Sequence, residues 1–350
     1  MRFIDLRSDT VTRPTDGMRE AMARAVVGDD VYDEDPTVNR LQEMMAERVG
    51  ADAGLFVASG TMGNLVAVLS HAGRGDEMIL GSLAHTYLYE VGAAAGLGGV
   101  HPWPIPNAPD GTLPLDAVAT AIRDVNVHFP TTRLLCLENT HNRCGGAVLP
   151  LDYTPAACEL AHARGMAVHL DGARLFNAAA AAGRTPAELA RGVDSVMVCL
   201  SKGLGAPVGS VLCGSHAFIG IAKRVRKMVG GGMRQVGVIA AAGVYALEHH
   251  VERLAVDHEN ARRLAAGIET IPGLRLLSTP VTNLVYLELD PGETGDPSID
   301  AAALSKRLKP QGVLANPLGS NRYQMRMVTH LDVSATDIDQ ALDALRATLR

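Results

Sequence analysis

The stretch Ser195-Val-Met-Val-Cys-Leu-Ser-Lys202-Gly-Leu-Gly205 indicates the kind of fold that this chain adopts. Its apolar first half is typical of a strand buried on both faces of a parallel sheet, and its glycines end that strand. Lys202 is one of only five lysines among the 32 lysines and arginines of the chain. An amine can lose its proton and attack a carbonyl, whereas a guanidinium cannot, so a Schiff base is the obvious role for this lysine.

Short apolar runs alternate with helical patterns on both sides of this stretch. Runs separated by helical patterns of about 10–15 residues are typical of a parallel sheet covered by helices on both faces. The sequence therefore predicts an α/β fold with a large, mostly parallel seven-stranded sheet. The expected strands lie at 53–58, 77–81, 100–105, 133–138, 166–170, 195–200 and 209–213.

The pattern changes along the chain in a way that divides it into three parts. Residues 1–14 are polar and have no helical period, which suggests an extended N-terminal arm. Residues 15–245 make the large domain, and residues 246–350 alternate shorter strands and helices, which predicts a small C-terminal α+β domain. The acidic loop from Asp29 to Asp35 is of the kind usually found on a solvated surface.

Composition excludes several classes of protein. The chain has 350 residues, of which 47% are apolar and 20% are charged, as in ordinary soluble globular proteins. A net charge of −6 without charged blocks argues against a nucleic acid partner, and no apolar run is long enough for a membrane span. Five cysteines without metal-ligand spacing suit a reducing cytoplasm, and with the scattered histidines they lead us to expect no catalytic metal.

Three of the expected strands end in residues that carry chemistry. Ser59, Gly60 and Thr61 join the first strand to a helix, and free N–H groups at a helix start can cradle a phosphate. Asp171 ends the fifth strand, where a carboxylate can keep a heteroaromatic nitrogen protonated, and Lys202 ends the sixth. Each feature alone is common, because Ser-Gly-Thr turns and helix-capping aspartates occur in many folds. Together they match pyridoxal phosphate, which needs a phosphate site, a partner for its ring nitrogen and an amine for its aldehyde.

A side chain that could stack on the cofactor ring lies in the loop Gly81-Ser-Leu-Ala-His85-Thr-Tyr87, after the second strand. Either His85 or Tyr87 could cover the ring. A histidine there could also act as an acid or a base, because its charge changes near neutral pH.

These stretches resemble those of the low-specificity L-threonine aldolases, a family of fold-type-I pyridoxal-phosphate enzymes in the β-eliminating lyase group. The resemblance runs almost from end to end of the chain and implies a fold of the PLP-dependent transferase type. The matching stretches are Asp5-Leu-Arg-Ser-Asp-Thr-Val-Thr-Arg-Pro14, Gly28-Asp-Asp-Val-Tyr32, Ser59-Gly-Thr-Met-Gly-Asn64, His85, Leu137-Glu-Asn-Thr-His141, His169-Leu-Asp-Gly-Ala-Arg174, Leu200-Ser-Lys-Gly-Leu-Gly205, Gly230-Gly-Gly-Met-Arg-Gln235 and Val328-Thr-His-Leu-Asp332.

The resemblance also implies roles for single residues around the cofactor. Lys202 would form the Schiff base, Asp171 would pair with the ring nitrogen, and His85 would stack on the ring. Arg234, in the glycine-rich turn, would reach the cofactor of a neighbouring subunit. The full cofactor set that we expect is Ser59, Gly60, Thr61, His85, Asp171, Arg174, Lys202 and Arg234.

The same resemblance implies a substrate site and a reaction. Ser8, Arg174 and Arg326 would hold the substrate carboxylate, and His128 would contact its hydroxyl. The expected reaction is retro-aldol cleavage of L-threonine or L-allo-threonine to glycine and acetaldehyde, a step of glycine formation and threonine breakdown. The base that takes the hydroxyl proton could be His85, His128 or a water molecule, and we favour His85.

Several alternatives stay open at this point. The enzyme could prefer β-phenylserine or another β-hydroxy amino acid, or it could be another lyase, a racemase or an aminotransferase on the same cofactor. A binding module without catalysis is a further alternative, although the intact Lys202 and Asp171 argue against it. The family suggests a cytoplasmic homotetramer, a dimer of dimers with shared active sites. The choice between threonine and allo-threonine, and a structural cation, are left undecided.

Overall fold

The protein is described by a computed structural model that covers residues 2–294, 296–319 and 321–349. Two compact units divide the chain: residues 14–251 form the larger one, and residues 2–13 with 252–349 form the smaller one. The first residues thus group with the C-terminal part of the chain, whereas the sequence suggested a separate arm. The division into domains near residue 245 stays a prediction.

The larger unit is built on a seven-stranded sheet with the strand order β2-β8-β7-β6-β5-β3-β4. Strand β8 runs antiparallel to both of its neighbours, and the other pairs are parallel, so the expected mostly parallel α/β sheet is confirmed. The strands are β2 (Ala53–Val57), β3 (Asp76–Gly81), β4 (His101–Ile105), β5 (Thr131–Glu138), β6 (Ala167–Asp171), β7 (Ser195–Cys199) and β8 (Ser210–Gly214).

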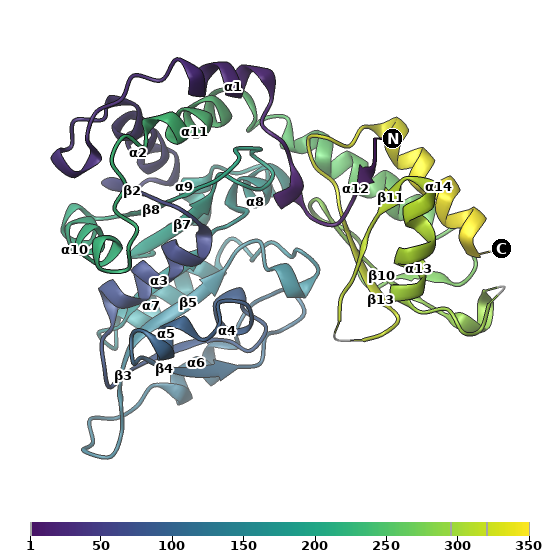
Figure 1. Ribbon diagram of the computed structural model, residues 1–350. Helices are drawn as coiled ribbons and strands as arrows, with labels where there is room; N and C mark the ends of the chain where they lie inside the picture. The colour runs from purple at the N-terminus through teal and green to yellow at the C-terminus, as the bar shows by residue number, and fades with distance from the viewer. Residues whose placement is uncertain (1, 295, 320, 350) are drawn as a thin grey trace. The chain divides into compact units, whose positions relative to one another are not determined.

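Helices of the larger unit cover both faces of this sheet (Figure 1). Every residue of β7 and β8 is buried, as expected for strands in the middle of a covered sheet. The helices are α1 (Asp16–Ala23), α2 (Pro36–Val49), α3 (Gly60–His71), α4 (His85–Leu88), α5 (Ala93–Gly96), α6 (Leu115–Ala121), α7 (Tyr153–His162), α8 (Leu175–Ala182), α9 (Pro186–Leu189), α10 (His216–Met228) and α11 (Gly237–His249).

Helix α3 lies unusually close to strand β7, because two glycines face the strand. A Cβ atom on Gly60 would lie 2.8 Å from Cys199 Sγ, and one on Gly63 would lie 2.5 Å from Met197 Cγ. Real Cβ atoms do not approach other atoms so closely. The two glycines therefore allow the start of α3 to sit directly against the end of β7.

The acidic loop is exposed over residues 31–34, as the sequence suggested, but two of its carboxylates are buried. Asp30 is 2% exposed, and its Oδ2 accepts a hydrogen bond of 2.6 Å from Arg226 in α10. Asp35 is fully buried, caps α2 and also accepts a hydrogen bond of 2.8 Å from the backbone of Gly237. Hydrogen-bond donors offset the unfavourable free energy of burying these two carboxylates.

The smaller unit combines an antiparallel sheet of order β12-β13-β10-β9 with a parallel β1-β11 pair. Its core is formed by α12, α13 and α14 packed with these strands, which agrees with the expected α+β pattern. The elements are β1 (Ile4–Asp5), α12 (Leu254–Ile268), β9 (Leu274–Leu276), β10 (Leu284–Leu289), α13 (Ala301–Leu308), β11 (Val313–Leu314), β12 (Asn316–Pro317), β13 (Gln324–Val328) and α14 (Ala335–Leu349). Short 3-10 turns occur at Asp9–Val11, Asp30–Tyr32, Asn142–Cys144, Pro291–Glu293 and Lys309–Gln311.

The close approach of α3 to β7 predicts that Gly→Ala lowers stability at a glycine facing the strand but raises it at a helical glycine with open space around it. Gly63→Ala should lower the free energy of unfolding by about 1–3 kcal/mol, because its methyl group overlaps Met197. Gly220→Ala, in α10, meets nothing within 4 Å and should raise it by about 0.5–1 kcal/mol through helix propensity. Thermal unfolding of both variants checks this, and equal shifts in the same direction would contradict it.

Candidate active site

The strand ends that the sequence singled out lie at one edge of the sheet. Strand β6 ends at Asp171, and Lys202 follows the end of the parallel strand β7 at Cys199. Strand β2 is antiparallel to β8, which is antiparallel to β7, so the loop from β2 into α3 emerges at the same edge. Ligands bind beyond the carboxyl ends of strands in sheets of this type.

The start of α3 has the features of an anion site. Ser59 is the N-cap, and its Oγ accepts a hydrogen bond of 3.1 Å from the backbone of Met62. The N–H groups in the first turn of a helix have no partner inside the helix, and the helix dipole favours an anion there. The Ser59 and Thr61 side chains are exposed and each offers a hydroxyl group. These features fit a phosphate group.

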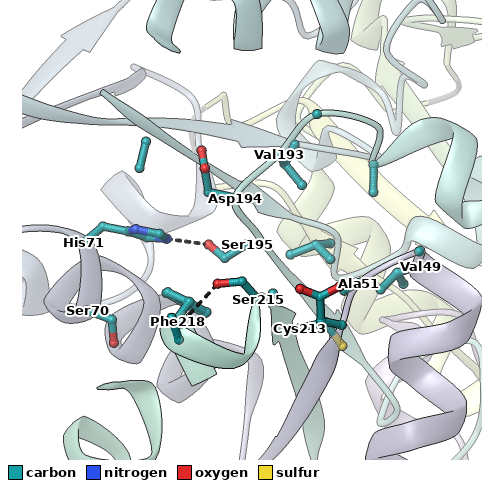
Figure 2. A pocket seen from close by; sticks show the side chains of 18 of the residues that line it. Val49, Ala51, Ser70, His71, Val193, Asp194, Ser195, Cys213, Ser215 and Phe218 are labelled. Carbon is teal, nitrogen blue, oxygen red and sulfur yellow. Dashed lines mark hydrogen bonds between the residues drawn. The ribbon is translucent and has the colours of Figure 1, made fainter. Parts of the chain in front are cut away.

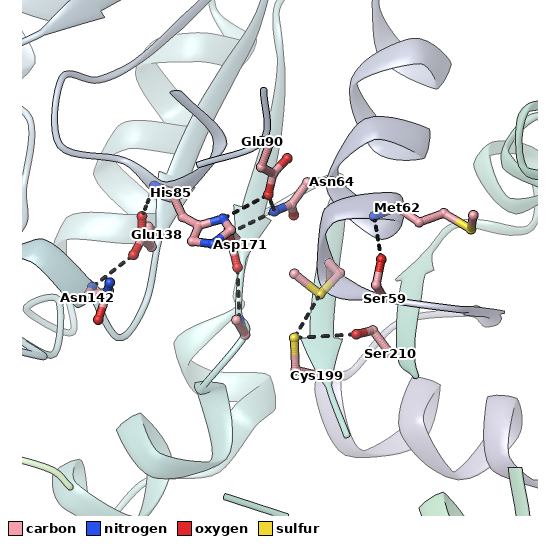
Figure 3. A network of polar contacts seen from close by, with 12 residues as sticks. Ser59, Met62, Asn64, His85, Glu90, Glu138, Asn142, Asp171, Cys199 and Ser210 are labelled. Atoms are coloured by element: carbon pink, nitrogen blue, oxygen red, sulfur yellow. Dashed lines mark hydrogen bonds and ion pairs between the residues drawn. The ribbon is translucent and has the colours of Figure 1, made fainter. Parts of the chain in front are cut away.

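Asp171 is buried, and donors hold both of its carboxylate oxygens. Asn64, in the second turn of α3, donates from Nδ2 to Asp171 Oδ2 over 2.8 Å (Figure 3). The backbone of Ala173 donates to Oδ1 over 3.0 Å. Hydrogen bonds of this kind stabilise a negative charge that burial would otherwise disfavour.

His85 contacts two carboxylates near Asp171. Its backbone N–H donates to Glu138 Oε2 over 2.7 Å, and its Nδ1 lies 2.9 Å from Glu90 Oε1 (Figure 3). Burial works against a charged imidazole, but the hydrogen bond with Glu90 and the charge of Asp171 outweigh it and raise the pKa of His85. The positive charge of Lys202 opposes this shift.

Glu90 is a member of the site that sequence reasoning missed. It is 3% exposed, and its Oε1 accepts hydrogen bonds from both Asn64 and His85. Burial and the nearby charge of Asp171 raise the pKa of Glu90, although its hydrogen bond with His85 opposes the shift. The only sequence signal was an acidic residue five positions after His85, in a segment of unclear periodicity.

The cluster of His85, Glu90 and Asp171 consists of residue types that can also hold a cation. One ligand atom from each lies within 4.8 Å of the others. The Asn64 amide, however, already donates to both carboxylates, over 2.8 Å in each case. These oxygens already accept hydrogen bonds, and the three side chains belong to one hydrogen-bond network with Asn64.

The other predicted residues of the larger unit occupy different surroundings. Arg174 is buried just before α8, three residues beyond Asp171, and Lys202 is half-buried. Arg234 is exposed and pairs with Asp29 over 3.1 Å. His128 lies on an exposed loop between α6 and β5, where its backbone donates to Asn126.

Two predicted substrate residues lie in the smaller unit. Ser8 caps the first 3-10 turn, and its Oγ accepts hydrogen bonds from the backbone and the hydroxyl of Thr10. Arg326, in β13, donates to the backbone oxygen of Arg7 over 3.5 Å. Their roles toward a substrate stay predictions.

The side chains at this edge fit pyridoxal phosphate. The start of α3 offers a phosphate site, and Asn64 on the same helix links that site to Asp171. Asp171 offers a buried carboxylate for the ring nitrogen, Lys202 offers an amine, and His85 offers a flat ring beside both. The first three are the functions that the cofactor needs from a protein, and the ring of His85 is a candidate to stack on it.

Known proteins match the chain over its whole length. The family model described as "Beta-eliminating lyase" matches residues 5–290. The low specificity L-threonine aldolase of Escherichia coli K12 is 49% identical and covers 99% of both chains. Low-specificity L-threonine aldolase 1 of Arabidopsis thaliana is 46% identical over 100% of this chain and 97% of its own length.

A solved structure supports the fold independently. The threonine aldolase of Leishmania major superimposes with a TM-score of 0.83 over 99% of both chains, at 21% sequence identity. Because the family model spans most of the sequence and the relatives match it from end to end, this chain belongs to the beta-eliminating lyase family of pyridoxal-phosphate enzymes.

Proposed function

We propose that this chain cleaves L-threonine and L-allo-threonine to glycine and acetaldehyde, with pyridoxal phosphate carried on Lys202. The observation that supports this most strongly is that His85 lies beside Asp171 at the end of β6, at the sheet edge where Lys202 follows the parallel strand β7. It occurs in a chain 49% identical to an enzyme named low specificity L-threonine aldolase. The proposed role is that of a lyase in threonine breakdown and glycine formation.

Pyridoxal phosphate, when bound, supplies an aldehyde for the substrate amine and a ring that takes up the electrons of the broken Cα–Cβ bond. The protein would bind the phosphate with Ser59, Gly60 and Thr61 at the start of α3. Asp171 would keep the proton on the ring nitrogen, because its charge is held in place by Asn64 and Ala173.

His85 is our candidate for the group that takes the proton from the substrate β-hydroxyl. The carboxylate of Glu90 stabilises the charged imidazole, which makes the ring a stronger base than an isolated histidine. The exposed position of His128 favours His85 for this step, while His128 keeps its proposed contact with the hydroxyl.

Arg174, Ser8 and Arg326 are the proposed holders of the substrate carboxylate. A planar guanidinium can bind a carboxylate with two parallel hydrogen bonds and so fix the orientation of the amino acid. A fixed orientation decides which bond at Cα breaks, because the breaking bond must stand perpendicular to the conjugated ring.

We also infer a cytoplasmic homotetramer with shared active sites, in which Arg234 approaches the cofactor of a neighbouring subunit. The exposed position of Arg234 and the five unpaired cysteine thiols are consistent with this setting. Within the described ranges, none of the helices is both long and apolar enough to cross a membrane.

Lys202 should be the single attachment point of the cofactor. After reduction with borohydride, peptide mass mapping should find the pyridoxyl group on Lys202, and Lys202→Ala should lack both this label and aldehyde release from threonine. Lys223→Ala, which removes an exposed lysine paired with Asp33, is the control and should keep both. A pyridoxyl label on any of the four other lysines of the chain would contradict the assignment of Lys202 as the attachment point.

Arg174→Ala should weaken substrate binding while the cofactor stays bound. Loss of a charge-assisted pair is worth about 1.5–3 kcal/mol, so KM for threonine should rise about tenfold to a hundredfold. Arg174→Lys should give an intermediate KM, because a point charge cannot reproduce the bidentate geometry. Loss of the cofactor absorbance with an unchanged KM would contradict the role.

Glu90→Gln should lower the pKa of His85, because it removes the charge that outweighs burial while keeping a hydrogen-bond acceptor. The raised pKa means that protonated His85 stabilises the fold below the ordinary pKa of 6.5, and that this contribution is lost as pH rises through the folded value. NMR titration of His85 in the parent, in Glu90→Gln and in the exposed control Glu188→Gln measures the shift. An unchanged pKa in Glu90→Gln would refute the coupling.

A further inference from the structure

We propose that His71, Ser195, His169 and Asn64 form a one-way chain of hydrogen bonds whose donors all point toward Asp171. His169 is then a positioning residue for the reaction, because it orients the amide that holds Asp171. The part of this inference that concerns catalysis rests on the proposed pairing of Asp171 with the cofactor ring nitrogen. The chain itself involves only side chains of the protein.

The contacts form a continuous line behind the active site. Asn64 Nδ2 donates to Asp171 Oδ2 over 2.8 Å, and Asn64 Oδ1 lies 3.1 Å from His169 Nε2. His169 Nδ1 lies 2.9 Å from Ser195 Oγ, which lies 2.8 Å from His71 Nε2. The three middle residues are at most 1% exposed, so water does not compete for these bonds.

Regular secondary structure brings these side chains together. Asn64 and His71 are seven positions apart in α3 and therefore share one face of that helix. His169 and Asp171 are two positions apart in β6 and share one face of the sheet, and His169 is in register with Ser195 of β7. One face of α3 therefore packs on β6 and β7, where Asn64 contacts His169 and His71 contacts Ser195.

The orientation of Asn64 follows from its two acidic neighbours. Glu90 Oε1 and Asp171 Oδ2 each lie 2.8 Å from the same atom of the amide, and both accept hydrogen bonds. Only the NH₂ group can donate twice, so Nδ2 must face the carboxylates and Oδ1 must face His169. Asn64 Oδ1 accepts, and His169 must therefore carry its proton on Nε2.

The neutral state of His169 fixes the next bond. Complete burial lowers the pKa of His169 to about 3, so the ring carries a single proton at neutral pH. With that proton on Nε2, Nδ1 is an acceptor, and the Ser195 hydroxyl must donate to it.

The Ser195 hydroxyl has only one proton, so its oxygen accepts from His71. Burial lowers the pKa of His71 to about 4, which leaves one proton on this ring as well, on Nε2. His71 lines a pocket of about 680 Å³ together with Asp194 and Phe218, at the amino ends of β6 and β7 (Figure 2). The chain of donors therefore runs from that pocket to Asp171 at the opposite end of the strands.

The physical effect is to hold one amide in one orientation. If His169 could not donate, the Asn64 amide would lose the partner of its oxygen and could turn that oxygen toward the carboxylates. An oxygen facing Asp171 would repel its charge and weaken the pairing with a protonated ring nitrogen. Each bond behind Asn64 also polarises the next one in the same direction.

The first test uses the protein without cofactor. In apo-protein labelled with ¹⁵N-histidine, His169 and His71 should both be neutral Nε2–H tautomers from about pH 5 to 9, since both pKa values lie below this range. Ser195→Ala should leave His169 neutral but remove the donor to Nδ1, which shifts the Nδ1 resonance. An Nδ1–H tautomer or a charged ring at His169 in the parent protein would overturn the proposal.

The second test compares two substitutions at His169. Gln offers one donor and one acceptor at similar spacing, whereas Leu fills the space without either. For His169→Leu we expect kcat for threonine to fall on the order of tenfold, as is usual when a second layer of hydrogen bonds is lost, with little change in KM. His169→Gln should recover most of that loss. His258→Leu, at a buried histidine of the smaller unit, is the matched control and should keep the parent kcat.

A spectroscopic readout separates positioning from a general loss of structure. Pyridoxal phosphate with a ¹⁵N ring label should show a protonated ring nitrogen in the parent and in His169→Gln, and a less protonated one in His169→Leu or Ser195→Ala. Equal ring protonation in all four proteins would refute the positioning role. If threonine is not cleaved, the histidine tautomers and the protonation of the cofactor ring nitrogen still test the inference. If threonine is cleaved but these two measurements differ from expectation, the inference is wrong and the proposed function stands.

Discussion

The side-chain amide of Asn64 is the contact on which the active site depends. Two buried carboxylates, Glu90 and Asp171, face the same small space, and neither could stay there without a donor. Asn64 supplies both donors from one nitrogen, and it can reach them only because α3 lies directly on β7. Gly60 and Gly63 make this close packing possible, because their missing Cβ atoms leave room for Cys199 and Met197. The same helix start forms the phosphate site, so one rigid element carries both the anion site and the support of Asp171.

The histidines of this region show how surroundings give one residue type different chemistry. His85 faces Glu90 and Asp171, and their charges raise its pKa despite burial. His169 and His71 lie only a few bonds behind Asp171, yet burial lowers their pKa values to about 3 and about 4. Their hydrogen bonds are made with the neutral side chains of Asn64 and Ser195. The site thus combines a histidine with a raised pKa, His85, with two neutral histidines behind Asp171 whose hydrogen bonds run in one direction.

The predicted strands of the larger unit are all present within a few residues, because short apolar runs bounded by glycine are a strong local signal. The cofactor residues Ser59, Asp171 and Lys202 could be proposed for a similar reason, since strand ends are visible in the sequence. Glu90 and His169 were not predicted as functional. Each looks unremarkable in its local sequence, and its importance comes from partners far along the chain. The burial of Asp30 in the otherwise exposed acidic loop was missed for the same reason, because its partner Arg226 is distant in sequence.

The α/β class and the order of strand ends that carry a candidate anion site, a carboxylate and a lysine could be inferred from the sequence, and the resemblance of its motifs indicated the family. These features depend on periodicity and on residue types at fixed local positions, which any reader of the chain can see. The tertiary structure alone decided that Glu90 and Asp171 share one amide, that His85 holds a proton more tightly than usual, and that His169 stays neutral. Those properties depend on burial and on distances of a few ångströms between residues that can be more than a hundred positions apart, and local sequence carries no measure of either.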